Sequence, residues 1–187
     1  MKKIIILSAA LLGFNLASNA QTTTAQTATA NQNVVLSLNN AIAITFVSTG
    51  ASYTGSDVTL TFNNVADYQN GVTSAPQHLF VQSNRPFKVS ANTTGTTFAF
   101  TNGAAGQVDP GMPVHNVLNA KVSNATSGSP AGSFGSFASL ENGSQDILTG
   151  CSNGGNEHFD VTYKATPGFL YPGGTYTTNV VYTATQN

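Results

Sequence analysis

The chain has 187 residues, of which 7% are charged, and it contains one cysteine and no tryptophan. Beyond residue 20, only four basic side chains face seven acidic ones, which gives a net charge of −3 with histidine neutral. A chain without clustered Lys or Arg is a poor match for nucleic acid or for an anionic membrane surface. So few acid–base groups also disfavour an enzyme, and no cofactor is expected.

The first 20 residues have the pattern of a cleavable export signal. Lys2 and Lys3 precede an apolar run over residues 4–16, and small residues at Ser18 and Ala20 suit a signal peptidase. The run is about 13 residues, shorter than the roughly 20 that span a bilayer. We therefore expect cleavage before residue 21 and export to the periplasm, the outer surface or the medium, with no transmembrane segment in the mature chain.

The pattern changes twice after the signal. Residues 21–32 (QTTTAQTATANQ) are polar and of low complexity, which predicts a flexible leader. From residue 33 to residue 187, apolar residues recur at every second position, beginning with Val34, Leu36 and Leu38. Period-two alternation is typical of strands with one buried face, so residues 33–187 are expected to form one β domain.

Similar alternating segments continue to the C-terminus, separated by turns rich in Gly, Asn and Pro. The predicted strands cover residues 34–38, 42–46, 58–62, 79–81, 87–91, 98–100, 118–122, 144–148, 159–163 and 175–185. No helix is expected after the signal. The pattern favours an all-β, antiparallel, immunoglobulin-like sandwich of about eight to ten strands, and a closed barrel is the alternative.

Two connections between the predicted strands are distinctive. Residues 67–71 (DYQNG) read as a turn, because Asn-Gly tolerates positive φ at little cost. Residues 124–143 form the longest irregular stretch. We expect its apolar residues Phe134, Phe137 and Leu140 to fold onto the core.

Three features offer chemistry, and each has a simpler interpretation. Residues 150–154 match G-x-S-x-G, but a nucleophile elbow needs a helix after the serine, whereas a strand is expected here. Glu157, His158 and Asp160 carry metal-ligand side chains, but only 158 and 160 share a strand face and no known ligand spacing completes a site. Cys151 cannot form an internal disulfide; we interpret it as an incidental loop thiol, with an intermolecular bridge as the alternative. Neither catalytic nor metal residues are predicted.

Aromatic side chains near loops supply a different kind of candidate site. Tyr53, Tyr68 and Tyr171 lie near predicted strand ends, where aromatic rings can stack on sugars. The alternative interpretation is that these tyrosines cover the rim of the core.

Two stretches support a resemblance to a known family. They are Leu79–Ala91 (LFVQSNRPFKVSA) and Phe159–Gln186, in which Gly174-Thr175-Tyr176 leads into an alternating terminal strand. The second resembles the C-terminal end of small secreted β-sandwich proteins of Gram-negative bacteria, the pilin-like and spore-coat-U-like surface proteins. The resemblance implies an immunoglobulin-like sandwich with a structural or adhesive role outside the cell. The chain departs from chaperone–usher pilins in lacking a penultimate Tyr and an internal disulfide.

Two functions follow as expectations. The first is a non-enzymatic structural or adhesive subunit in which Val34, Leu36 and Leu38 pair with a sheet edge of another copy or of another surface protein. In the alternative within this hypothesis, the same residues pair inside their own domain. The second function is a soluble module that binds glycans or cell wall.

Overall fold

The computed structural model describes residues 28–47, 57–101, 103, 105 and 107–187. The expected signal (1–20), the start of the leader (21–27) and Tyr53 lie outside these ranges. The chain divides into two units, residues 1–37 and residues 38–187. In the first unit, residues 28–37 have no regular secondary structure and their side chains are exposed.

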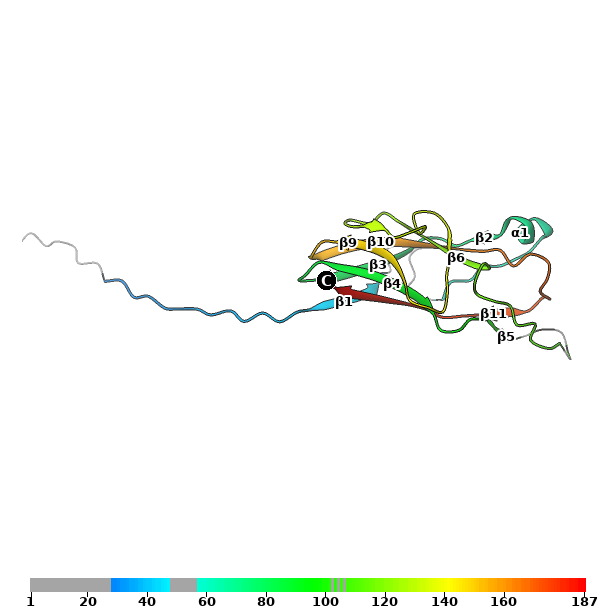
Figure 1. Ribbon diagram of the computed structural model, residues 1–187, viewed down its shortest axis with the longest axis horizontal. Helices are drawn as coiled ribbons and strands as arrows, with labels where there is room; N and C mark the ends of the chain where they lie inside the picture. The colour runs from blue at the N-terminus through cyan, green and yellow to red at the C-terminus, as the bar shows by residue number, and fades with distance from the viewer. Residues whose placement is uncertain (1–27, 48–56, 102, 104, 106) are drawn as a thin grey trace, which may run out of the picture. The chain divides into compact units, whose positions relative to one another are not determined.

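The second unit is an antiparallel β-sandwich, which confirms the expected all-β fold (Figure 1). One sheet has the order β1-β3-β10-β6-β8, and β2 also pairs with β10. Its strands are β1 (Ile42–Phe46), β2 (Val72–Thr73), β3 (Gln77–Ser83), β6 (Leu118–Ser123), β8 (Ala138–Ser139) and β10 (Gly154–Ala165). The other main sheet has the order β12-β4-β9-β7. Its strands are β4 (Phe87–Thr93), β7 (Ser129–Pro130), β9 (Gln145–Cys151) and β12 (Val180–Gln186). A short pair joins β5 (Ala99–Thr101) to β11 (Thr175–Thr177).

Alternation along the central strands builds the core between the sheets. In β3 and β4 every second side chain is buried, and β6 follows the same rule. The fully buried side chains come from both sheets, and the largest are Phe87, Phe159, Leu79, Leu140, Ile147 and Leu148. Burying such side chains contributes roughly 1.5–3 kcal/mol each, so this interior is the main source of stability.

Three predicted strands differ in the structure. Residues 34–41 form no strand, and the first strand begins at Ile42. Residues 58–62 also form none, although Val58 and Leu60 pack against the core. The predicted strand 175–185 divides into β11 and β12, which belong to different sheets. Period-two alternation reports an extended chain with one sheltered face, but a strand also needs a neighbouring backbone with which to pair.

The turn predicted at residues 67–71 is wrong in part, because a six-residue helix, α1 (Val65–Asn70), replaces most of it. Asn64 caps this helix: its side chain accepts from the Asp67 amide, while the Asp67 carboxylate accepts from the Asn64 amide. This reciprocal capping box satisfies two donors that a helix start leaves unpaired. Gly71, at φ 79°, ends the helix.

The irregular stretch 124–143 folds onto the sandwich largely as expected. Phe134 and Leu140 are buried in the core, whereas Phe137 remains exposed. The stretch also contributes two strands of two residues each, β7 and β8. Nowhere in the described ranges is there a helix of the length and apolarity needed to cross a membrane.

Candidate functional site

The two sheets end beside each other along one edge of the sandwich, which we call the open edge (β1 and β12). Each strand is the last in its sheet, and no described strand pairs with its far side. The rings of Phe46 on β1 and Tyr182 on β12 meet edge to face, with centroids 5.9 Å apart. The open edge therefore presents one free backbone from each sheet.

Apolar side chains that face the interior are visible to solvent at the open edge. Ile42 and Phe46 pair with the buried residues Ser83 and Leu79 and therefore share their inward face. They are nevertheless 37% and 43% exposed. An interior strand with this register would bury such residues, whereas on the edge strand β1 they remain partly in contact with solvent.

The open edge also lacks the features that normally prevent strands from pairing with other molecules. Neither β1 (IAITF) nor β12 (VVYTATQ) contains Lys, Arg, Asp, Glu or Pro. The seven residue pairs between β12 and β4 run without a bulge. Charges, prolines and bulges are the usual protection of a sheet edge, and β12 therefore presents a straight and unprotected one.

The residues predicted to form an assembly strand lie in the N-terminal segment. Val34, Leu36 and Leu38 are 73%, 81% and 84% exposed, and Val35 between them is 81% exposed. No strand is assigned to residues 28–41. These aliphatic side chains are exposed, and their residues belong to no strand that the structure describes.

Aromatic rings gather at another place, which we call the aromatic end (Phe62, Tyr68, Phe169, Tyr171 and Tyr176). Tyr68 on α1 stacks on Phe169 with centroids 5.5 Å apart and planes 23° apart. Phe62 packs against Tyr68 at 5.2 Å. Figure 1 shows α1 and the β5–β11 pair at the end of the sandwich opposite the C-terminus.

Tyr176 hydrogen-bonds to the loop that carries the predicted ligand residue Tyr171. Its pKa is raised, first because burial removes the phenol from water, then by the negative charge of Asp109, and then by Tyr68 and Tyr171 when their phenols ionise. Its hydroxyl donates to the Pro172 carbonyl at 2.8 Å, and its ring lies 4.9 Å from that of Phe100. Phe169, which stacks on Tyr68, is two residues before Tyr171, so the structure brings Tyr68 and Tyr171 into one neighbourhood. The same region contains Phe62, Phe169 and Tyr176, which the sequence did not single out because no local motif distinguishes them from core aromatics.

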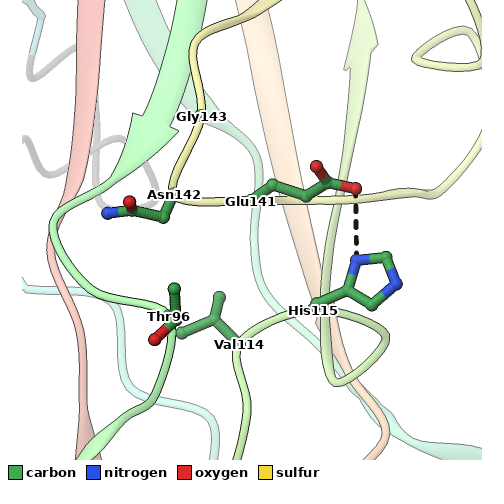
Figure 2. Close-up of a pocket in the computed structure, with 6 residues that line it drawn as sticks. All are labelled: Thr96, Val114, His115, Glu141, Asn142 and Gly143. Carbon is green, nitrogen blue, oxygen red and sulfur yellow. Dashed lines mark ion pairs between the residues drawn. The ribbon is translucent and has the colours of Figure 1, made fainter.

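A shallow pocket of about 400 Å³ lies near the ends of β4 and β6 (Figure 2). Its residues are Thr96, Val114, His115, Glu141, Asn142 and Gly143. The His115 Nδ1 is 3.2 Å from the Glu141 carboxylate and 3.4 Å from the Ser139 hydroxyl. In a catalytic triad the serine and the acid occupy opposite ring nitrogens. Here both share Nδ1, so the arrangement is not a triad.

The acidic residues of β10 are engaged in hydrogen bonds with neighbouring side chains. Asp160 is buried, and its two carboxylate oxygens lie 2.6 Å from His78 Nδ1 and 2.7 Å from the Asn124 amide nitrogen. His158 packs its ring 4.8 Å from that of His78. Glu157 accepts from the hydroxyls of Thr126 and Ser127. Among the described residues, no group of three or more His, Cys, Asp or Glu is placed to hold a metal.

The G-x-S-x-G match falls in the hairpin between β9 and β10. Cys151 ends β9 and Gly154 begins β10, so no helix follows the serine. Cys151 itself is buried in the core rather than lying in a loop. Burial, with the charge of Glu157 adding to it, raises the pKa of its thiol to about 11. The thiol is therefore shielded and protonated at neutral pH.

Comparison with protein-family models, with curated proteins and with solved structures finds no match to this chain.

Proposed function

We propose that this protein is a structural subunit of an exported surface assembly whose copies join by strand pairing. In this scheme the segment with Val34, Leu36 and Leu38 of one copy adds a strand along the free side of β12 of the next copy. The observation that carries the proposal is the open edge, where the inward-facing Ile42 and Phe46 remain more than a third exposed. The export pattern of the first 20 residues accords with a role outside the cell.

The donor and the acceptor match in spacing. Val34, Leu36 and Leu38 occupy alternate positions, as do the partly buried Val180, Tyr182 and Ala184 of β12. Alternate side chains of a strand point to the same face about 6.6 Å apart. An added strand therefore places three aliphatic side chains over the exposed parts of Ile42 and Phe46, while its backbone pairs with β12. Each buried side chain contributes roughly 1.5–3 kcal/mol before the cost of ordering the segment.

The donor half is tested by sedimentation of the mature chain (residues 21–187) over a concentration series. We expect oligomers from the unmodified chain and monomers from Leu36→Asp, because a buried carboxylate opposes insertion. Val35→Asp is the matched control, since residue 35 is equally exposed but has the opposite parity. Its oligomers should persist. An unmodified chain that stays monomeric at every concentration contradicts the proposal, as does equal loss in both variants.

The acceptor half needs variants of the open edge. Ile42→Lys places a cation on the inward face of the open edge and should abolish oligomers. Thr45→Lys is the control: residue 45 pairs with the outward-facing Phe80 of β3, so its cation points away from that face and the oligomers should persist. A peptide of residues 31–40 should bind the full-length Leu36→Asp chain in a one-to-one ratio. The same peptide with Asp at position 36 should not bind. Failure of the unmodified peptide to bind would exclude strand donation.

A further inference from the structure

Helix α1 does not contribute to the core. None of its residues is buried, and six residues are too few for a helix to persist in water by themselves. What holds it is the Asn64–Asp67 capping box together with the contacts of Tyr68. The helix therefore serves to place Tyr68, and the question becomes what Tyr68 and its neighbours are for.

Two rings contact Tyr68, one from shortly before α1 and one from a segment far away in the sequence. Phe62 comes from the extended stretch before α1, and Phe169 comes from the loop between β10 and β11. Phe169 is 62% exposed and the adjoining Leu170 is 86% exposed. Aromatic contacts of this kind are worth about 0.5–1.5 kcal/mol each. The stack thus holds an exposed phenylalanine ring in one orientation, which lowers the entropic cost of binding a ligand to it.

The segments that form the stack are polar and contain no cation of their own, and Lys164 of β10 lies beside Gly71 at the end of α1. Residues 57–71, 97–113 and 167–177 contain no Lys, Arg or His, and their charged residues are Asp57, Asp67 and Asp109. Exposed amides lie just before α1 at Asn63 and within its last turn at Gln69 and Asn70. Anionic lipids, sulfated polymers and nucleic acid require clustered positive charge. One lysine does not supply such a cluster, so the site favours an uncharged ligand with hydroxyl groups.

We propose that the aromatic end binds a neutral carbohydrate chain, with the exposed ring of Phe169 as its stacking surface. The C–H groups on one face of a sugar ring are weakly positive and pack on the negative face of an aromatic ring. The amides beside α1 then hydrogen-bond the sugar hydroxyls, which fixes orientation as in other small-molecule sites. This binding does not depend on the strand-mediated assembly, because it uses none of the residues of the open edge.

Binding is measured on the full mature chain carrying Leu36→Asp, so that assembly does not multiply the affinity. The probes are maltohexaose, cellohexaose, mannohexaose and chitohexaose, titrated by calorimetry. The chain has no tryptophan, and three of its six tyrosines (Tyr68, Tyr171 and Tyr176) belong to the aromatic end, so part of its tyrosine emission comes from this site. We expect one hexasaccharide to bind and to change this emission. Phe169→Ala should weaken binding at least about tenfold.

Two sets of control variants distinguish the contribution of the Phe169 ring to binding from general effects on the protein. Phe137→Ala removes another exposed phenylalanine outside the aromatic end and should leave the affinity unchanged. Tyr68→Phe keeps the stack and should retain most of the affinity, whereas Tyr68→Ala removes the support of Phe169 and should not. Three results would overturn the proposal: no binding of any hexasaccharide, binding that Phe169→Ala leaves intact, or binding of phosphatidylcholine vesicles in place of sugars.

Discussion

The hydroxyls of Tyr163 and Tyr182 lie 2.6 Å apart and join the two sheets through the interior of the sandwich. Tyr163 belongs to β10, a central strand of one sheet, and Tyr182 to β12, the last strand of the other. Burial raises the pKa of both phenols, most strongly for Tyr182, where the neighbouring Tyr163 adds to the effect. The pair therefore holds the strand proposed as the acceptor in its place.

This pair should make the fold sensitive to alkali. Since both folded-state pKa values lie above the ordinary value near 10, their contribution to stability is complete below pH 10. It is lost as the pH rises further, because the unfolded state releases its protons first. Chemical unfolding from pH 8 to pH 12 should show this decline, and it should be smaller in Tyr182→Phe.

Tyr182→Phe should also lower the free energy of unfolding at pH 7 by about 1–3 kcal/mol, because it leaves the buried Tyr163 hydroxyl without this partner. The double variant Tyr163→Phe/Tyr182→Phe removes both hydroxyls and should recover most of that loss. A single variant as stable as the unmodified chain would show that the hydrogen bond contributes little.

Asp160 should matter more to stability than Asp146, an exposed carboxylate on β9 of the other sheet. Asp160→Ala removes the acceptor of the Asn124 amide and of the His78 contact, and should lower the free energy of unfolding by about 2–3 kcal/mol. Asp146→Ala breaks an ion pair with Lys88 in which both side chains are 41% exposed, and should cost less than about 1 kcal/mol. Urea titrations of the two variants compare these losses directly; equal losses would contradict the role given to Asp160.

Cys151 should be unreactive in the folded protein. With a pKa of about 11, only about one thiol in a thousand is ionised at pH 8, and the sulfur is buried. Ellman's reagent should therefore titrate no thiol in native protein and one thiol per chain in denaturant. A disulfide-linked dimer on a non-reducing gel of native protein would contradict this expectation and restore the alternative of an intermolecular bridge.

Substitutions at two glycines distinguish the cost of backbone strain from the cost of a steric clash. Gly128 and Gly132 both have positive φ, at 77° and 53°. A Cβ at Gly128 would lie 2.6 Å from the Thr149 carbonyl oxygen and 2.8 Å from the Cys151 sulfur, whereas at Gly132 it would meet nothing within 4 Å. Gly132→Ala should cost about 1–2 kcal/mol from strain alone. Gly128→Ala should cost clearly more, and thermal unfolding of both variants measures the difference.

Several strands could be predicted from sequence because their side chains alternate between core and solvent. The apolar parity of Leu79 and Val81, of Phe87 and Val89, and of Ala120 and Val122 matches the buried face of β3, β4 and β6. Helix α1 was missed, because its first turn depends on a reciprocal cap between Asn64 and Asp67 that resembles turn chemistry.

The sequence by itself determined the all-β class and the faces of the central strands, since period-two burial is a local property of the chain. Only the tertiary structure decided which strands end each sheet, so that Ile42 and Phe46 are left exposed beside β12. It also decided that Phe62, Tyr68 and Phe169 meet. Such contacts join residues up to about a hundred positions apart. They depend on how the sheets pack, which no local pattern of side chains records.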